Sequence, residues 1–373
     1  MLVLLISSCS NSRHLGEDRY LLTRNKIIFE KENPGIETSE LHGLIQQKPN
    51  KRFLGLMRFK LWAYNRSFKG RDTRYRQWLR NTVGERPVIL DTSTAARTCV
   101  DMEKYLANVG YFHSDVDYSV QFNERSKKAH VTYSVDPSDP YRIADLSYEI
   151  SDPELAAWIS RTASASLIRT GNNYNVYTLD EERERVSNFL VNNGYYGFVK
   201  DYIFFEVDSA LGNRQMEVFF KVKNKTLSAT DSAGNFIEER HHRYLIDRVE
   251  IYPDFDPSTP FPGKEPFDTL VEEVHQVRRN KSPNYYHILF REKLRINPGI
   301  LAQSTLIENG EPYSLKDVQE TYKRYGNLSI YKFADIGFNE SGSTLMPDSG
   351  GFRDLTCRLR LQRAPVHQYS IEA

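Results

Sequence analysis

The stretch that decides the fold occurs twice in clear form. Residues 106–112 read Leu-Ala-Asn-Val-Gly-Tyr-Phe, and residues 190–196 read Leu-Val-Asn-Asn-Gly-Tyr-Tyr. A weaker third copy, Tyr-Lys-Arg-Tyr-Gly-Asn-Leu, covers residues 322–328. Similarity of this kind within one chain indicates that the protein is built from repeated structural units.

Each copy closes a segment whose apolar residues recur at helical spacing. Thr178 opens the second of these segments as a helix cap, and Ser314 opens the third. We expect Gly110, Gly194 and Gly326 to end the helices, because glycine adopts the left-handed C-terminal turn without the penalty of a Cβ atom.

After each glycine the apolar period changes from 3.6 to 2, which predicts a β-hairpin. Another short strand and another helix precede each of these long helices. The chain is therefore predicted to be α+β, with three tandem β-α-α-β-β modules, each a three-stranded mixed sheet covered by two helices. The predicted hairpins span 116–135, 201–222 and 330–361, and the leading strands span 21–29, 141–150 and 244–252.

The spacing of the copies also predicts the boundaries of the modules. The third module is longer than the second, so it is expected to carry an insert rich in proline and charge. The predicted parts are a signal remnant and tether at 1–19, module 1 at 20–137 with an insert at 50–88, module 2 at 138–224, a linker at 225–239, module 3 at 240–363 with an insert at 255–294, and the start of a further strand at 364–373.

Composition excludes several classes of protein. The chain has 50 Lys+Arg against 49 Asp+Glu, so bulk charge does not point to a polyanion ligand. The 12% aromatic content argues for a folded chain, and no apolar run approaches the ~18 residues of a membrane-spanning helix. Three cysteines without CxxC spacing cannot form a disulfide framework or a zinc site, and we expect Cys99 and Cys357 to be small buried hydrophobes.

Cys9 is different, because it follows an apolar run at 2–6 and the small pair Ser7-Ser8. This order resembles a bacterial lipobox, in which the cysteine is acylated and holds the mature chain to a membrane. The run is short and no Lys or Arg precedes it. An ordinary frayed terminus is the alternative.

No catalytic or ligand-binding motif is found in the sequence. The chain has no Walker A loop and no strand-GxGxxG-helix pattern. The adjacent His241 and His242 would point to opposite faces of a strand, so they cannot chelate one metal ion. We expect a non-enzymatic protein without cofactor or metal.

The segment at 51–66 interleaves basic and aromatic residues with no acidic residue. One interpretation is a helical insert packed on the first module with its cations in water. Another is contact with a membrane interface or a partner, and a third, which we do not favour, is nucleic acid. The candidate contact residues are Arg58, Lys60, Trp62, Tyr64 and Arg66.

The β-α-α-β-β unit with its Leu-x-Asn-x-Gly-Tyr-Tyr exit resembles the polypeptide-transport-associated (POTRA) domain. Three such units in series resemble the periplasmic arm of the BamA/TamA outer-membrane assembly family. The lipobox followed by residues 18–26, Asp-Arg-Tyr-Leu-Leu-Thr-Arg-Asn-Lys, is similar to the opening of the lipid-anchored TamA-like (TamL) branch. Residues 365–373 resemble the start of the first strand of that family's β-barrel.

The resemblance implies a location at the outer membrane of a Gram-negative bacterium, facing the periplasm. It also implies that the second strand of each sheet lies at an edge and pairs with a client strand by β-augmentation. The implied partners are unfolded outer-membrane proteins or a periplasmic TamB-like assembly partner, with membrane contact through the anchor and a barrel and with no nucleic acid. The candidate edges are 114–122, 199–207 and 329–338, and the candidate client-binding residues are Asp115, Asp117, Tyr118, Asp201, Tyr202, Phe204, Ile330, Tyr331 and Phe333.

Two other functions stay open at this point. One is the arm of a two-partner secretion transporter, although such arms usually have two modules and no lipobox. The other is a periplasmic enzyme or ligand-binding lipoprotein built on repeated α/β modules. A deep polar pocket with convergent titratable groups would favour the enzyme, whereas open strand edges would favour a binding arm.

Overall fold

A computed structural model describes residues 19–31, 35–52, 58–68, 70–230, 236–257, 266–274, 283–291, 293–341 and 351–364. Contacts divide the chain into two compact units. Unit 1 contains residues up to Asp145 with Thr170–Tyr177 and Asp208–Glu217, and unit 2 contains the remainder. Among the described residues, no helix combines the length and apolar character needed to cross a bilayer.

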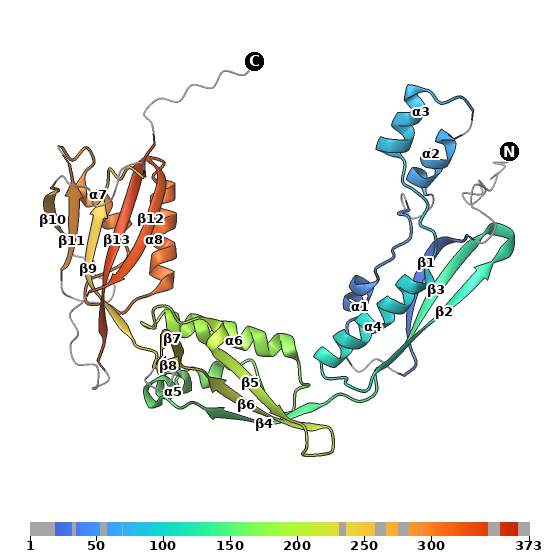
Figure 1. Cartoon of the computed structure of the whole chain (residues 1–373), viewed down its shortest axis with the longest axis horizontal. Coiled ribbons are helices and arrows are strands. Elements are labelled where there is room, and N and C mark those ends of the chain that lie inside the picture. The colour runs from blue at the N-terminus through green and yellow to red at the C-terminus, as the bar shows by residue number, and fades with distance from the viewer. Residues whose placement is uncertain are drawn as a thin grey trace, which may run out of the picture. The chain divides into compact units, whose positions relative to one another are not determined.

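The first sheet has the strand order β1-β3-β2, with β1 (Leu21–Phe29), β3 (Lys128–Asp136) and β2 (Asp115–Asn123). β1 runs parallel to β3, and β2 runs antiparallel to it. Helices α1 (Thr38–Leu44) and α4 (Thr92–Asn108) lie beside this sheet (Figure 1), and their buried apolar residues belong to one core cluster with those of the strands. A short 3-10 turn at Glu124–Ser126 joins β2 to β3.

The predicted insert of the first module is helical. It contains α2 (Phe59–Ser67), α3 (Arg74–Trp78) and a π-helical turn, Leu79–Val83. α2 buries Leu61 and Ala63, while Phe59 and Tyr75 remain exposed.

The second sheet has the order β4-β6-β5, with β4 (Arg142–Glu149), β6 (Gln215–Val222) and β5 (Ile203–Asp208). Its helices are α5 (Pro153–Ser160), capped by Asp152 as its Asp-Pro start predicts, and α6 (Val176–Val191). 3-10 turns occupy Ala163–Ala165 and Lys200–Tyr202. The prediction that Thr178 caps α6 was wrong, because the helix begins earlier and the Asn175 side chain accepts from the Tyr177 N–H (2.9 Å).

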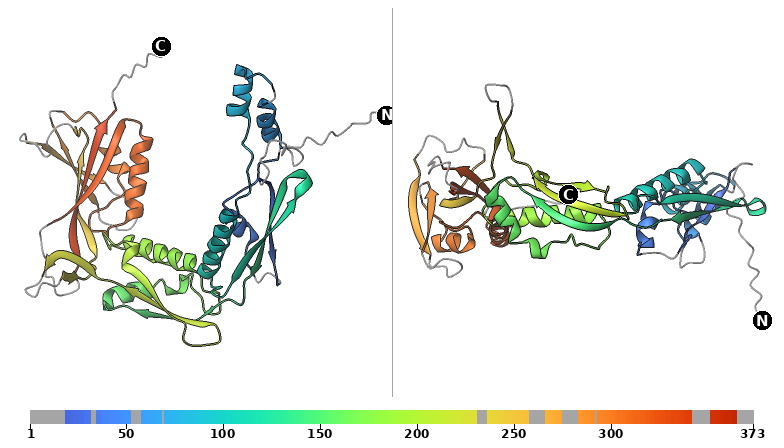
Figure 2. Two further views of the ribbon diagram at one scale, coloured as in Figure 1. Left: turned by 45° about the vertical axis from the view of Figure 1, so that its right-hand side comes forward. Right: turned by 90° about the horizontal axis from the view of Figure 1, so that it is seen from below.

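The third sheet has five strands in the order β10-β11-β9-β13-β12, so the prediction of three strands per module fails here. The insert at 255–294 contributes β10 (Asp268–Val274) and β11 (Asn284–Phe290) beside β9 (Tyr244–Tyr252). β13 (Arg353–Arg363) and β12 (Tyr331–Glu340) complete the sheet, with helices α7 (Pro298–Ser304) and α8 (Leu315–Asn327). The expected linker forms a separate hairpin of β7 (Lys225–Thr230) and β8 (Phe236–Glu239). The mixed α+β fold is confirmed, and Figure 2 shows the helices beside their sheets in two further views.

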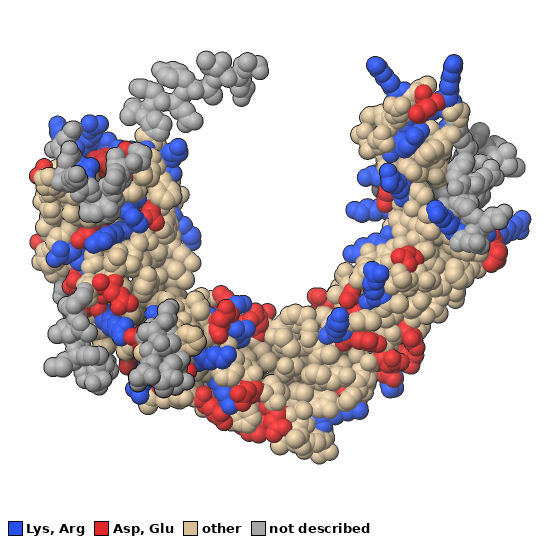
Figure 3. Space-filling model, in the orientation of Figure 1, with Lys and Arg blue, Asp and Glu red and all other residues tan. Residues whose placement is uncertain are grey.

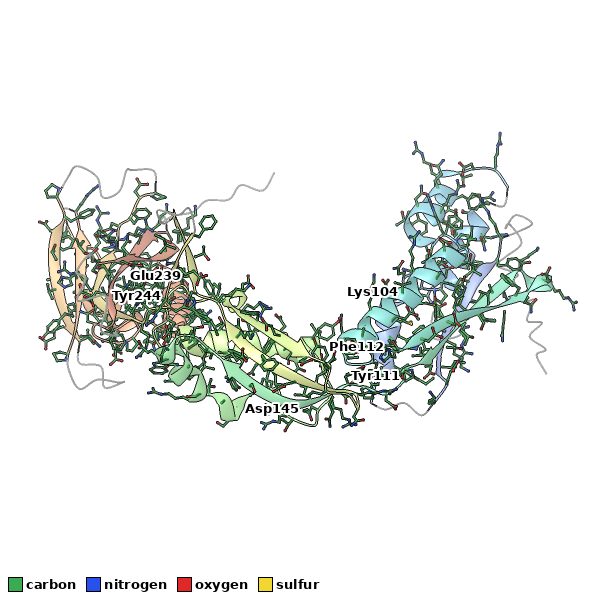
Figure 4. The ribbon with its side chains drawn as sticks, turned by 60° about the horizontal axis from the view of Figure 1, so that its bottom comes forward. Lys104, Tyr111, Phe112, Asp145, Glu239 and Tyr244 are labelled. Atoms are coloured by element: carbon green, nitrogen blue, oxygen red, sulfur yellow. The ribbon has the colours of Figure 1, made fainter. Side chains whose placement is uncertain are left out.

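The first copy of the repeat forms a joint inside unit 1. Gly110 follows α4 with φ +98°, as predicted, and its carbonyl accepts the Tyr141 N–H (2.8 Å). The Tyr141 carbonyl then accepts the Tyr174 N–H (2.9 Å). Phe112, labelled in Figure 4, packs against both tyrosine rings with centroids 5.3 and 5.6 Å away. The motif therefore connects the end of one predicted module to the start of the next.

The second copy repeats this joint inside unit 2. Gly194 has φ +102°, and its carbonyl accepts the Tyr244 N–H (2.8 Å), while the Tyr244 carbonyl accepts the Tyr313 N–H (3.0 Å). Tyr196 packs against both rings at 5.7 and 5.0 Å. The aromatic residue that follows the Gly-Tyr pair, Phe112 or Tyr196, thus packs against both tyrosine rings of its joint in each copy.

The third copy differs from its prediction. Gly326 lies within α8 and does not have positive φ, whereas Ser329 has φ +56° after the helix. Tyr325 is fully buried, and it packs against Tyr331 with ring centroids 5.9 Å apart. The helix runs past Gly326 to Asn327, and the Leu328 N–H donates to Arg324 O (3.2 Å).

Candidate functional site: open strand edges

In each of the three larger sheets, the strand that follows the long helix lies at one edge. These strands are β2, β5 and β12 in the first, second and third sheets. An edge strand presents N–H and C=O groups that no neighbouring strand satisfies. The topology therefore places three rows of such groups on the chain, in the strands that the family resemblance implies.

The opposite edge of the first sheet is covered by the flanks of the helical insert. The Leu22 N–H donates to Val88 O, and the Leu90 N–H donates to Tyr20 O, each at 2.8 Å. Further along β1, the Arg58 guanidinium donates to Thr23 O (2.7 Å). These contacts cover the beginning of the β1 edge, at Leu22 and Thr23.

In the other two sheets, the beginning of β4 and the outer side of β9 are covered. The Ile143 N–H of β4 donates to Asn172 O (2.9 Å), and the Gly171 N–H donates to Ile143 O (2.8 Å). In the third sheet, β11 pairs with β9 along the side away from β13. The insert strands therefore move that edge outward to β10.

At the edge of β2, a backbone N–H of the strand donates a hydrogen bond to a side chain of the neighbouring helix α4. The Val135 carbonyl accepts the Glu30 N–H (3.0 Å), so the backbone groups of Val135 face β1. Its cross-strand partner Val116 must then direct its N–H away from β3. The Glu103 carboxylate of α4 accepts that N–H at 3.3 Å.

A similar contact occurs at β5, but here the strand carbonyl accepts and the helix side chain donates. The Lys223 N–H donates to Tyr202 O, so the next carbonyl, that of Ile203, faces outward. Arg183 of α6 donates its Nε–H to Ile203 O at 2.8 Å. Asp180 and Asp201 hold the guanidinium by ion pairs at 3.1 and 3.2 Å.

At β12 the helix side chain that makes this contact is a tyrosine. The Tyr322 hydroxyl of α8 accepts the Ile336 N–H at 2.9 Å. Each edge strand is therefore attached to its long helix by one side-chain hydrogen bond. Sequence reasoning missed Glu103, Arg183 and Tyr322, because they differ in type and stand at different distances from the repeat glycine.

The predicted client-binding residues in the first two sheets are only partly at the edge strands. Asp115 and Asp117 are exposed on β2, and Tyr118 is half-buried beside them. Asp201 and Tyr202 lie in the 3-10 turn before β5, so their placement in a strand was wrong. Phe204 lies within β5 and is half-buried. The strand begins late because Val199–Tyr202 makes the turn out of the second joint.

In the third sheet, Phe333 is 49% exposed on β12 and Ile330 is 41% exposed just before it. Tyr331 lies on β12 but is only 8% exposed, so its side chain is turned into the core. Burial raises the pKa of Tyr331 far above its usual value, and its ring belongs to the core around Tyr325. Phe333 is the most exposed of the three predicted residues on this edge.

The cysteines and the basic segment are placed as follows. Cys99 and Cys357 are buried, as predicted, and burial raises the pKa of Cys99 to about 11, with further contributions from Glu103, Asp117 and Asp115. Cys9 lies outside the described residues.

In the basic segment, Lys60 and Arg66 are exposed on α2, and Trp62 and Tyr64 are half-buried. Arg58 donates a hydrogen bond to the backbone of β1.

A hollow of about 380 Å³ lies in unit 2, where Glu308, Glu311, Asp317 and Glu320 gather near the start of α8. The Ser314 hydroxyl in its wall is occupied as a helix cap, since it accepts the Asp317 N–H (3.3 Å). Within the described ranges, no set of three or more His, Cys, Asp or Glu side chains has a metal-binding arrangement. The strand edges are therefore the candidate site with a defined geometry.

No protein-family model matches the chain, and no curated protein matches it. Solved structures do. The crystal structure of Haemophilus influenzae BamA POTRA3-5 matches 94% of this chain and 99% of its own at 10% identity and TM-score 0.36. POTRA1-3 of the periplasmic domain of Omp85 from Anabaena matches 94% and 98% at 10% identity and TM-score 0.25. CdiB from Escherichia coli matches 57% of this chain and 29% of its own at 12% identity and TM-score 0.23.

Proposed function

We propose that this chain is the periplasmic arm of an outer-membrane protein assembly or translocation factor of the BamA/TamA kind. Its edge strands would bind strands of unfolded clients or of a partner subunit by β-augmentation. The observation that carries the proposal is that β2, β5 and β12 lie at sheet edges, whereas β9 lies inside its sheet and the beginnings of β1 and β4 are covered. Backbone pairing gives affinity without demanding a client sequence.

Charge at the first edge gives this binding a preference. Burial is the main reason that the pKa of Cys99 is raised, and the nearby carboxylates of Glu103, Asp115 and Asp117 raise it further. A client strand on β2 would therefore lie among carboxylates. Strands that carry lysine or arginine on the facing side are favoured there, because opposite charges attract across neighbouring strands.

The experiment that tests the proposal places a photo-crosslinking residue at Phe333 of β12 in the full-length protein. The matched control is the same probe at Arg248, which is exposed on β9 in the interior of the same sheet. We expect outer-membrane client strands to be captured at position 333 and much less at position 248. Equal capture at both positions would contradict binding at the edge.

The same experiment includes the variant Tyr322→Phe, which removes the hydroxyl that occupies the Ile336 N–H. A client strand would no longer compete with that hydroxyl. A net hydrogen bond of about 1 kcal/mol corresponds to about fivefold higher client affinity at this edge. Unchanged capture at position 333 with an intact circular dichroism spectrum would argue against pairing along β12.

The proposal extends to the anchor at Cys9 and to the TamA-like (TamL) branch. Acylation of Cys9 would keep the arm at the membrane even while a client engages its strands. We expect palmitate labelling of the full-length protein to disappear in Cys9→Ala and to persist in a Cys99→Ala control. Labelling that survives the Cys9 change would refute the anchor.

A further inference from the structure

A hollow of about 600 Å³ lies in unit 1 between β1 and the segment that follows α1. Its lining includes Arg24 of β1 together with Lys48 and Arg52, and no carboxylate is among the lining residues. The remaining lining residues are Thr23, Asn25, His42, Ile45 and Pro49. The hollow is therefore a cationic pocket on a part of the first module that the client-binding edge does not use.

Further cations surround the pocket. Arg58 donates to Thr23 O (2.7 Å) and to Asn50 O (3.3 Å), which fixes its guanidinium beside the lining. On β3, His130 is the strand partner of Arg24 and contacts the Thr23 hydroxyl at 3.1 Å. Figure 3 shows Lys and Arg side chains gathered over the part of unit 1 that carries α2.

The positive charge of this pocket is not balanced within the described part of the chain. Arg24, Lys48, Arg52 and Arg58 make no ion pair there, although many other cations of the protein do. The pKa of His130 is lowered by burial and then by the neighbouring cations Arg24, Arg58, Lys128 and Arg52. Like charges held together at this density favour an anionic ligand.

We propose that this pocket binds a phosphate group, either that of an anionic lipid headgroup or that of a soluble phosphorylated compound. Arginine suits phosphate because its planar guanidinium donates two parallel hydrogen bonds, and Lys48 adds a point charge. Arg58 is committed to backbone carbonyls, so it fixes the wall and adds to the field. The pocket then gives the first module a contact that is independent of client strands.

The test compares the whole chain with the triple variant Arg24→Gln, Lys48→Gln, Arg52→Gln. The matched control is Arg97→Gln, Lys104→Gln, Arg125→Gln, which removes the same charge from exposed positions of unit 1 outside the pocket. One arm measures sedimentation with vesicles of phosphatidylglycerol and phosphatidylcholine in equal parts. The other measures calorimetric binding of inorganic phosphate.

We expect the pocket variant to lose about a hundredfold in affinity, from ~1 kcal/mol per basic residue, and the control to lose far less. Loss in the vesicle arm identifies a lipid headgroup, and loss in the phosphate arm alone identifies a soluble phosphate. Equal losses in the two triple variants would mean bulk charge, and no binding by the unaltered chain in either arm would also overturn the proposal. Circular dichroism of all three proteins separates these results from unfolding.

Discussion

The change Gly110→Ala is expected to lower the free energy of unfolding of the first joint by about 3 kcal/mol. Alanine at φ +98° costs ~1–2 kcal/mol in backbone strain. The added Cβ would also lie 2.7 Å from Tyr174 O, a backbone atom, so the Tyr141 and Tyr174 hydrogen bonds must shift. Urea unfolding followed by circular dichroism, with hydrogen exchange at these two amides, measures the effect.

Gly171→Ala is the matched control for this prediction. Gly171 also has positive φ, at +84°, but a Cβ there meets no atom within 4 Å. It should therefore show the conformational cost alone, about 1 kcal/mol. If the two variants lose the same stability, then the close approach of Tyr174 to Gly110 does not hold the joint.

The second large effect is expected for Arg185→Ala in α6. The Glu182 side chain is fully buried, and it receives two hydrogen bonds from Arg185 (2.7 and 2.8 Å) and one from the Leu167 N–H (3.0 Å). Removing the guanidinium leaves a buried carboxylate without its counter-ion, which costs about 3 kcal/mol in unfolding free energy. Denaturant titration of the full chain measures the change.

Two companion variants interpret the result. Lys323→Ala breaks the exposed pair with Glu320, whose side chain is 46% exposed, and it should cost less than about 1 kcal/mol. Adding Glu182→Gln to Arg185→Ala should recover part of the stability, because a neutral amide still accepts the Leu167 N–H. No recovery in the double variant would show that lost packing of Arg185, and not the stranded charge, causes the effect.

The sequence predicts what depends on local periodicity and on short motifs. The residues Gly110 and Gly194 end their helices as expected, and the Asp152 cap is in place. Gly326 does not end its helix, because α8 continues to Asn327 and the left-handed conformation falls on Ser329. Similarly, α6 begins at Val176, where the Asn175 side chain accepts the Tyr177 N–H, whereas the sequence motif indicated Thr178 as the cap.

Long-range pairing is the part that the sequence does not reveal. β10 and β11 lie in a segment without clear periodicity, and their pairing with β9 depends on residues far away in the chain. For the same reason, the covering of β1 by Val88 and Leu90 was not foreseen. The edge position of β2, β5 and β12 came from the family resemblance. The hydrogen bonds that Glu103, Arg183 and Tyr322 make with these strands are seen only in the structure.

The second joint has a consequence for how the chain can be divided. The Asn192 side chain, inside the repeat motif, accepts the Lys316 N–H at the start of α8 (2.8 Å). That helix thus draws one of its N-terminal partners from a residue that precedes its own sheet in the chain. A recombinant fragment begun after Gly194 would lose this partner, so a clean exchange of modules between related proteins has to carry the preceding motif along.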